Sequence, residues 1–342
     1  MSVADTLLGR KGRGRSIGVI AGDDDAKGLQ DYFASFGCND VFLLLSQRYL
    51  PERIRLSANY FRQQRRYAPG RYDVLVNSIS DPDHNARTLE VAARLARESG
   101  RPVLNAPARI PGMTRERVAA RLREVEGLHV PGIIRVPRGE AGKLRAAAER
   151  ADLRWPLIVR RCGTHGGEIA GVVEDPRGLD GLTLDPRAPH YLIEFADFRS
   201  PDGFFRKRRI FFIGDRLCPR HLLVSEHWNV HASARKFILG HPDWMAAEAA
   251  FVEGGEAEIA EPFRSTLKRV RAAIGLDYFG IDCSFLEDGR ILLFECNPAM
   301  NLFPFSDEPA LAYLKAMLPP ALDAMDALIE ARIAEAGGPA LP

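Results

Sequence analysis

Short apolar runs and amphipathic segments alternate along the first hundred residues of the chain. The apolar runs are three to six residues long, which is typical of buried strands. They lie at Ser16–Ala21, Val41–Leu45, Asp73–Asn77 and Pro102–Leu104. The segments between them are predicted to be helical, at Ala26–Phe36, Pro51–Arg62 and His84–Ser99. Because strands that alternate with helices form crossover units, this pattern predicts an α/β domain with a mostly parallel sheet.

The segment His84–Ser99 has the clearest helical pattern. Asp81-Pro82-Asp83 precedes it and offers capping carboxylates, and Gly100 follows it as a stop. Its apolar positions recur with helical spacing, at Leu89, Val91, Ala92, Leu95 and Ala96. One face of this helix is therefore expected to lie on the sheet.

The pattern changes after Leu104-Asn105-Ala106-Pro107. A short Arg-rich helix is predicted from Thr114 to about Glu126, and residues 127–200 then combine short strands with Gly-rich turns. Residues 204–342 mix strands with helices, the last of which, Pro309–Ala334, should break at Pro319-Pro320. We therefore expect a flexible N-terminus, an α/β domain, two further subdomains and a loose tail, at residues 1–15, 16–107, 108–200, 201–335 and 336–342.

The composition is that of an ordinary globular protein and argues against several classes. The 342 residues carry 47 Lys and Arg against 45 Asp and Glu, so bulk charge does not favour nucleic-acid binding. No apolar run approaches the roughly 18 residues of a membrane helix, and residues 1–16 lack the apolar core of a signal peptide. The five cysteines are widely spaced, which predicts a reducing cytoplasm rather than a disulfide framework.

The strongest local signal is a hairpin near the C-terminus. Its two apolar runs, Ile281–Leu286 and Arg290–Pro298, are joined by a segment that contains Asp288-Gly289, and Asp-Gly between apolar runs is typical of a tight turn. A two-residue turn at Asp288-Gly289 would fix the pairing of the strands. One face would then be wholly apolar and lie on a core, with the members Ile281, Cys283, Phe285, Leu292, Phe294 and Cys296.

The opposite face of this hairpin carries two acids. In the predicted register Asp282 lies directly opposite Glu295, with Cβ atoms about 5 Å apart, and alternation places Asn297 on the same face. Like charges so close are destabilising unless a cation lies between them. Oxygen ligands with an amide nearby suit Mg²⁺ better than zinc. The alternative interpretation is an exposed hairpin with solvated acids.

A Gly-rich loop between two predicted strands is a second candidate. The strand Trp155–Arg161 ends in two arginines, and the loop Cys162–Glu168 leads into the strand Ile169–Val173. The loop is neither a P-loop nor a dinucleotide fingerprint. Its glycines would let backbone N–H groups approach a phosphate closely. A plain hairpin turn is the alternative.

A third segment combines an apolar strand, acids and a basic run. The strand His190–Ala196 leads into acids, and Arg206–Arg209 then lies within an aromatic strand pattern, so that the basic run is not a free tail. Arg209 leads directly into an apolar strand. It is either a phosphate-side residue or part of a solvated turn.

These three segments, in this order, resemble the ATP-grasp superfamily, and in particular its glutathione-synthetase and ribosomal-protein glutamate ligase branch. The resemblance covers roughly residues 100–335. Asp282 followed by Phe294-Glu295-Cys296-Asn297-Pro298 is similar to the family's metal-binding Asp and Glu-x-Asn. Asn105-Ala106-Pro107 resembles the start of the grasp domain, and Ile193–Ala196 resembles the hinge whose backbone binds adenine.

The resemblance implies an N-terminal α/β domain followed by a two-subdomain ATP-grasp fold, with ATP and Mg²⁺ as cofactors. Two metal ions are expected, with Mn²⁺ as an alternative, on Asp282, Glu295 and Asn297. The Gly-rich loop, the hinge and the basic strand would bind the nucleotide. The residues concerned are Arg160, Arg161, Gly163, Thr164, His165, Gly166, Gly167, Glu194, Phe195, Ala196, Asp197, Asp202 and Arg209. Asp197 and Asp202 are alternatives for the ribose.

The chain also departs from the family pattern. Arg160 stands where many members have a phosphate-binding Lys, although Arg can hold phosphate through two bonds. For the family's second Lys the chain offers Arg115 and Arg117. Arg220 falls where related ligases place a basic residue on phosphate, and Asn301 would reach substrate. The expected catalytic residues are thus Arg160, Arg220 and Asn301. A zinc site is not predicted at the three histidines His221, His227 and His231, because their spacing matches no common metal site.

The resemblance implies an ATP-dependent carboxylate–amine ligase that forms an acyl phosphate. Its partners would be a small-molecule, amino-acid or peptide carboxylate and an amine, with no nucleic acid and no membrane, and a homodimer is compatible with it. Two other functions stay open. One is a nucleotide-binding protein of this fold without ligase activity, and the other is a kinase-like phosphoryl transferase.

Overall fold

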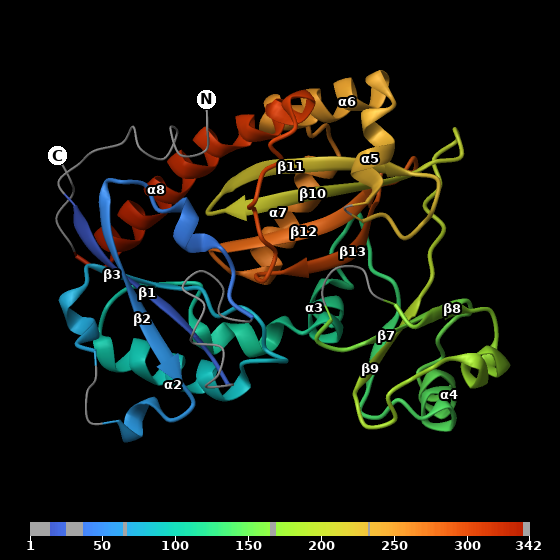
Figure 1. The fold of residues 1–342 in the computed structure, drawn as a ribbon, viewed down its shortest axis with the longest axis horizontal. Coiled ribbons are helices and arrows are strands. Elements are labelled where there is room, and N and C mark those ends of the chain that lie inside the picture. Colours follow the sequence, from blue (N-terminus) through green and yellow to red (C-terminus); the bar gives the residue numbers. More distant parts are fainter. Residues whose placement is uncertain (1–13, 25–36, 64–66, 165–168, 232, 338–342) are drawn as a thin grey trace.

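The protein is described here by a computed structural model that covers residues 14–24, 37–63, 67–164, 169–231 and 233–337. Three β-sheets form the framework of this described part of the chain, and the helices pack around and between them (Figure 1). The predicted helix at 26–36 and most of the predicted N-terminal and C-terminal tails lie outside the described residues. No helix in the described part of the chain is both long enough and apolar enough to span a membrane.

The first sheet is parallel and has the strand order β2-β1-β3-β4. Its strands are β1 (Arg15–Asp23), β2 (Tyr49–Ser57), β3 (Val74–Asn77) and β4 (Val103–Leu104). The helix α2 (Ala86–Ser99) buries Leu89, Ala92 and Leu95, and Gly100 ends it in the left-handed conformation with φ 63°. The α/β architecture predicted for this domain is confirmed.

Two predicted elements of this domain are wrong. Val41–Leu44 forms a short buried 3₁₀ helix rather than a strand. Tyr49–Ser57, which overlaps the predicted helix Pro51–Arg62, is the strand β2, and Ile54 and Leu56 are fully buried with an arginine between them. This is a period of two, which fits a strand. Pro51 is tolerated because β2 lies at the edge of the sheet.

The start of α2 also differs from the prediction. Asp81 Oδ1 accepts hydrogen bonds from the backbone N–H groups of Asp83 and His84, and so it holds the turn before the helix. The first turn of the helix is capped by Asp24 at the end of β1. Its carboxylate accepts from the backbone N–H groups of Arg87 at 3.1 Å and Thr88 at 2.7 Å.

The second sheet is largely antiparallel, with the order β11-β10-β12-β13-β5. Its strands are β10 (Phe205–Ile213), β11 (Arg216–Ser225), β12 (Tyr278–Phe285), β13 (Ile291–Asn297) and β5 (Leu128–His129), the last parallel to β13. The third sheet is antiparallel, with the order β6-β9-β7-β8. Its strands are β6 (Ile133–Val136), β7 (Leu157–Arg161), β8 (Gly171–Val173) and β9 (His190–Glu194).

The remaining helices cover these sheets. They are α3 (Arg115–Leu122), α4 (Ala141–Arg150), α5 (Ala234–Leu239), α6 (Pro242–Glu253), α7 (Phe263–Ile274) and α8 (Leu318–Glu335). The predicted break in the C-terminal helix is present: a 3₁₀ helix, Pro309–Met317, precedes α8. Pro319 and Pro320 lie in the first turn of α8, where the missing N–H groups of proline cost nothing.

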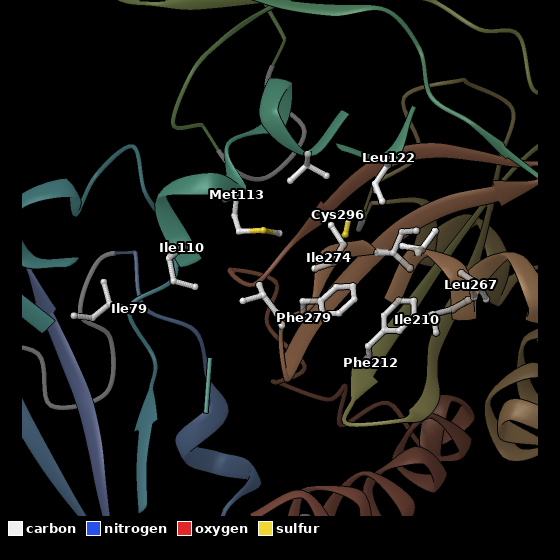
Figure 2. Packing of buried hydrophobic residues seen from close by; sticks show 14 of the residues in the cluster. Ile79, Ile110, Met113, Leu122, Ile210, Phe212, Leu267, Ile274, Phe279 and Cys296 are labelled. Atoms are coloured by element: carbon white, nitrogen blue, oxygen red, sulfur yellow. The ribbon is translucent and has the colours of Figure 1, made fainter. Parts of the chain in front are cut away.

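The main core joins α2 and the first sheet to one face of the second sheet through α3 and α7 (Figure 2). The rings of Phe212 and Phe279 stack there with centroids 4.4 Å apart. On the other side, α8 packs against both the first sheet and the second. The segment with α3 and β5 thus belongs with the second sheet, although it falls within the predicted 108–200 unit.

Candidate active site

A row of four polar residues crosses the second sheet. His221 on β11 pairs with Arg209 on β10, Arg209 pairs with Asp282 on β12, and Asp282 pairs with Glu295 on β13. Direct cross-strand partners present their side chains on the same face of a sheet. The predicted pairing of Asp282 with Glu295 is therefore confirmed, and the sheet extends it to two further side chains.

Two β-bulges border this row. In β13 the residue Phe294 has no direct partner, because Asp282 pairs with Glu295 while Cys283 pairs with Leu293. In β11 the residue Arg220 has none, because Arg209 pairs with His221 while Ile210 pairs with Pro219. A bulge adds one residue to a strand and re-aims the side chains around it.

The bulge in β13 corrects the predicted faces of the hairpin. At the tip, the backbone N–H of Leu286 donates to the carbonyl of Arg290, so the turn has three residues rather than two. Leu292 consequently packs in a cluster on the side of the sheet away from the main core. The ring of Phe294 lies against Phe198 on that side, with centroids 4.7 Å apart. The apolar face on the core consists of Ile281, Cys283, Phe285, Ile291, Leu293 and Cys296.

The two acids of the row are held by cations. The guanidinium of Arg209 donates to both carboxylate oxygens of Asp282, at 2.7 and 2.8 Å, and the Lys207 ammonium lies 3.3 Å from Asp282. Arg115 at the start of α3 lies 2.7 Å from the Glu295 carboxylate and donates to the carbonyl of Phe294 at 2.9 Å. Arg115 thus binds both the acid and the bulge beside it.

The charge state of Asp282 follows from these contacts. Burial by itself would raise the pKa of Asp282, but the Arg209 and Lys207 charges hold that pKa well below its usual range. Asp282 is therefore ionised at neutral pH. Beside it, Asn297 donates through Nδ2 to Glu295 Oε1 at 2.5 Å, and its Oδ1 accepts from the backbone N–H of Ala299. Two carboxylates and one amide thus converge at the row.

One cavity of about 720 Å³ contains most of the predicted site. Its described lining includes the predicted residues Arg160, Glu194, Phe195, Ala196, Arg209, Arg220, Asp282, Glu295, Asn297 and Asn301. Arg115, Lys207 and Arg235 add further positive charge, while the carboxylates of the lining are Glu194, Asp282 and Glu295. A cavity with more cations than carboxylates favours a polyanionic ligand.

The strand β7 brings the Gly-rich loop to this cavity. Gly163 and Thr164 line a smaller adjoining pocket of about 80 Å³, which shares Arg160 and Glu295 with the large one. Gly163 has φ 72°, a left-handed conformation that favours glycine. The predicted loop residues His165, Gly166 and Gly167 lie outside the described residues.

Arg160 and Arg161 have different surroundings. The Arg160 guanidinium donates to the carbonyl of Thr164 at 2.6 Å, and burial together with the nearby Arg115 charge lowers the pKa of Arg160 to about 10. Arg161 is the next residue on β7, so it points to the opposite face. It lies 3.8 Å from Asp185, is more than half exposed, and does not line the described cavity.

The hinge residues lie on β9 and just after it. Backbone N–H groups of Glu194 and Phe195 donate to the carbonyls of Gly132 and Pro156, and the Glu194 carboxylate accepts from the backbone N–H groups of Gly132 and Arg154. The Phe195 ring meets Trp228 edge to face, at 5.4 Å between centroids. Both rings line the cavity and give this end an apolar wall.

Neither ribose candidate reaches the cavity in this structure. Asp197 is paired with Arg199 at 2.8 Å and Asp202 with Arg206 at 2.5 Å, and both carboxylates are about half exposed. Neither is among the described lining residues. Their role in ribose binding stays a prediction.

Several lining residues were not predicted from the sequence. Lys207 is two residues before Arg209 on β10, so strand alternation would have identified it. His221 lies in the row, and its Nε2 is buried with no hydrogen-bond partner in the described structure. Burial lowers the pKa of His221 well below its usual value, and the Arg209 charge acts in the same direction. Arg235 comes from α5, and no local pattern points to it.

The start of β12 is tied to the first domain by Asn105. Its side-chain oxygen accepts from the backbone N–H groups of Asp277 and Tyr278, at 2.8 and 2.9 Å, and its amide nitrogen donates to the carbonyl of Tyr278. Asn105 has φ 51°, which Asn tolerates better than most residues. The Asn-Ala-Pro segment singled out in the sequence therefore fixes the strand that carries Asp282.

Comparisons with known proteins show the fold. The D-Ala:D-Ser ligase VanG from Enterococcus faecalis aligns with 92% of this chain and 99% of its own, at 14% identity and a TM-score of 0.53. The ATP-grasp ligase PsnB, in complex with a minimal precursor, aligns with 92% of this chain and 99% of its own, at 15% identity and a TM-score of 0.50. No protein-family model and no curated protein matches the sequence. The predicted ATP-grasp fold is confirmed.

Proposed function

We propose that this chain, which has the fold of the ATP-grasp ligases, is an ATP- and Mg²⁺-dependent carboxylate–amine ligase. The substrate carboxylate takes the γ-phosphoryl group of ATP and releases ADP. An amine then attacks the acyl carbon, and inorganic phosphate leaves as the amide bond forms. The observation that carries the proposal is the row of Arg209, Asp282 and Glu295 on the wall of a cavity that also holds Arg160.

The described residues suit the parts of a nucleotide. Arg160 and Arg115, with the backbone of Gly163 and Thr164, form a cationic wall for phosphates. Phe195 and Trp228 provide flat apolar surface for a base at the other end. Arg209 lies beside Asp282 on the wall of the cavity and would balance charge that develops on the transferred phosphoryl group.

The donor set at the row fits Mg²⁺. Asp282 and Glu295 offer carboxylate oxygens and Asn297 an amide, which suits a hard cation such as Mg²⁺ or Mn²⁺. Mg²⁺ is commonly bound by one or two carboxylates together with phosphate oxygens, so the proposed site would be completed by substrate. When bound, the metal would neutralise phosphate charge.

The protein's own part in this reaction is to position the reactants and exclude water. An acyl phosphate is hydrolysed by water, so the site must close during the reaction. The loop that begins at Gly163 is the proposed lid. Arg220 is proposed to contact the phosphoryl group, and Asn301 the substrate.

A thermal-shift experiment tests nucleotide binding. Mg-ATP should raise the Tm of the wild-type chain by mass action, and Glu295→Ala should remove most of the part that depends on Mg²⁺. The control is Glu287→Ala, because Glu287 is an exposed acid at the tip of the same hairpin. If millimolar Mg-ATP leaves the wild-type Tm unchanged, the proposal is wrong.

An ADP-release screen over carboxylate and amine pairs then tests the chemistry. A ligase releases ADP and phosphate only when both substrates are present or when the acyl phosphate is hydrolysed. A kinase-like enzyme would instead accumulate a stable phosphorylated product without an amine. ATP binding with no ADP release for any pair would favour the nucleotide-binding function.

The proposal includes three predictions from the sequence that concern the protein as a whole. They are domain boundaries near residues 107, 200 and 335, a cytoplasmic location and a homodimer. Limited proteolysis checks the boundaries, and light scattering checks the dimer. The substrate carboxylate and amine are expected to be small molecules, amino acids or peptides.

A further inference from the structure

The segment that follows β13 forms part of the cavity wall and packs closely on the second sheet. Its residue Asn301 is exposed and lines the cavity, whereas the next residue, Leu302, is fully buried. Met300 lies against Gly280 on β12. A Cβ atom at Gly280 would be 2.6 Å from Met300 Sδ, so glycine lets the two approach. The segment thus lies directly against the strand that carries Asp282.

Arg220 on β11 holds this segment from one side. Its Nε donates to the carbonyl of Leu302 at 2.9 Å and its Nη2 to the carbonyl of Pro304 at 3.1 Å. Its guanidinium also lies over the Phe305 ring, 4.3 Å from the centroid. As the extra residue of a bulge, Arg220 lies outside the normal alternation of its strand. Its direction therefore depends on these contacts.

Asp40 in the first domain holds the same segment from the other side. It precedes the 3₁₀ helix Val41–Leu44, but its side chain makes no capping hydrogen bond to that helix, although Asp is a common capping residue. Its carboxylate accepts instead from the backbone N–H of Phe303 at 2.6 Å and from that of Leu302. The Tyr278 hydroxyl donates to the same carboxylate at 3.3 Å.

One peptide group joins Asp40 to Arg220. It lies between Leu302 and Phe303, and its N–H donates to Asp40 while its carbonyl accepts from Arg220 Nε. Hydrogen bonds at the two ends of one peptide group polarise and strengthen each other. A change at Asp40 is therefore passed to Arg220 through this group.

The charges around Arg220 add to this link. Burial lowers the pKa of Arg220 to about 10, and the charges of Arg235 and Arg209 act in the same direction. The charges of Glu248 and Asp40 oppose them. Glu248 forms its own ion pair with Arg235. Asp40 thus supports Arg220 both through its charge and through the shared peptide group.

We propose that Asp40 is a positioning residue for Arg220, and that it fixes the direction in which the Arg220 guanidinium meets the γ-phosphate of ATP. This inference rests on the proposed function, in which Arg220 contacts the phosphoryl group. It gives the first domain a part in distinguishing ATP from ADP, because Asp40 belongs to that domain.

The experiment measures nucleotide binding to the full chain by calorimetry. The probes are AMPPNP and ADP, each with Mg²⁺, at pH 7.5, and the quantity compared is the ratio of the two affinities. Arg220→Met should lower the preference for AMPPNP at least about tenfold, because it removes a charged donor. Asp40→Ala should lower it about three- to tenfold, since Arg220 remains but is held less well.

Asp40→Asn serves as a second, milder variant. It keeps the size of the side chain and one acceptor oxygen, so its preference should lie between those of the wild type and Asp40→Ala. It also measures the effect if Asp40→Ala does not fold.

A double variant distinguishes positioning from general stability. Asp40→Ala combined with Arg220→Met should show the same preference as Arg220→Met alone, because Asp40 acts through Arg220. Ser46→Ala is the matched control. Ser46 is also buried and follows the same 3₁₀ helix, but its hydroxyl donates to Asp326 on α8 at 3.1 Å, and it does not line the described cavity. Its loss should change the preference less than about twofold.

Amide hydrogen exchange checks the segment itself, without nucleotide. In peptides that cover residues 298–306, Asp40→Ala should speed the exchange of the Leu302 and Phe303 amides at least about tenfold, because both lose a charged acceptor. Ser46→Ala should leave this exchange unchanged.

Four results would overturn the inference while the proposed function stands. They are an unchanged preference in Asp40→Ala, unchanged amide exchange in that variant, an equal loss of preference in Ser46→Ala, and a further loss in the double variant beyond that of Arg220→Met. A wild-type chain that binds neither nucleotide would overturn the proposed function and this inference with it.

Discussion

Arg209 and Asp282 face each other directly across β10 and β12, and the guanidinium donates one hydrogen bond to each carboxylate oxygen, at 2.7 and 2.8 Å. This two-bond geometry is the strongest form of the Arg–carboxylate pair. It fixes the charge and the orientation of the acid at the centre of the proposed metal site. It also places the Arg209 charge on the wall of the cavity.

The first prediction concerns this pair. Arg209→Met should destabilise the protein by about 3 kcal/mol at neutral pH, because a buried carboxylate loses its main partner. Asp282 has a depressed pKa, so its contribution to stability is present above the ordinary Asp range and is lost as pH falls below it. The deficit of the variant should therefore persist from pH 7 to about pH 4 and shrink as the pH falls further. Urea denaturation at pH 7 and at about pH 3 measures it.

A double variant is the control for this prediction. Arg209→Met with Asp282→Asn removes both charges, so it should recover part of the stability that Arg209→Met loses. If the double variant is less stable than the single variant by the full cost of a second independent change, the two side chains are not coupled.

The second prediction compares adjacent arginines. Arg160→Ala should weaken ATP binding by about 1.5–3 kcal/mol, the range for hydrogen bonds to charged groups. Arg160→Lys should keep part of the affinity, since the charge remains. Adenosine binding should hardly change in either variant. Calorimetric titration of ATP and adenosine gives all of these values.

Arg161→Ala is the matched control. Arg161 is the next residue along β7, but it lies near Asp185 and does not line the described cavity. Its loss should leave ATP affinity within about twofold of the wild type, since the change of net charge alone is screened by salt. Equal effects of the two alanine variants would show that ATP responds to overall charge and not to the position of Arg160.

The third prediction concerns the joint at Asn105. Asn105→Ala should destabilise the protein by about 2–4 kcal/mol, because two buried backbone N–H groups lose their acceptor. Asp152→Ala is the control. Asp152 also has positive φ, at 50°, but it is exposed, so its variant should show only the backbone cost of about 1 kcal/mol. Thermal unfolding of both variants separates the two contributions.

The fourth prediction is a pH dependence at Asp40. Burial raises the pKa of Asp40 to about 6. The backbone N–H groups of Phe303 and Leu302 and the Tyr278 hydroxyl bind the carboxylate and oppose this rise, but burial has the larger effect. The folded state therefore binds more protons than the unfolded state between about pH 4 and 6, so stability falls as pH rises through this window. The free energy of unfolding of Asp40→Asn, relative to that of the wild type, should therefore rise by on the order of 2 kcal/mol between pH 4 and pH 7.5.

Asp202→Asn serves as the control for this pH effect. The hydrogen bond from Arg206 lowers the pKa of Asp202 to about 2, so its pH dependence has the opposite sign and falls mostly below about pH 4. Asp202→Asn should therefore show little change between pH 4 and pH 7.5. Denaturation of each variant against the wild type at both pH values measures the difference. A gain for Asp40→Asn that is the same at pH 4 and pH 7.5 would contradict the raised pKa.

The hairpin shows how far local pattern carries a prediction. The alternation around Asp282 and Glu295 predicts their pairing, and the structure confirms it. The turn has one residue more than predicted, and the bulge at Phe294 shifts the register back by one. The acids are therefore paired as predicted while Leu292 and Phe294 lie on the other face. A bulge of this kind leaves no mark in the spacing of apolar residues.

In the first domain, local sequence patterns predicted the wrong type for two elements. Val41–Leu44 is helical although it was predicted as a strand, because a run of four apolar residues has no period that separates a strand from a helix. The strand Tyr49–Ser57 does carry a period of two, at Ile54 and Leu56, but the proline at its start also suits a helix. The segment forms a strand, and its position at the edge of the sheet is one that tolerates proline.

The sequence by itself determined the α/β class, the acid pair, the Gly-rich loop and the resemblance to ATP-grasp ligases, because each depends on residues that are close in the chain. Only the tertiary structure decided which cations meet those acids and which line the cavity. Arg115 reaches Glu295 from a helix 180 residues away in sequence. Arg235 is held by Glu248 on α6, whose carboxylate also accepts a hydrogen bond from the hydroxyl of Tyr313. Such contacts depend on how helices pack on a sheet, and packing is set by the whole core rather than by any local period.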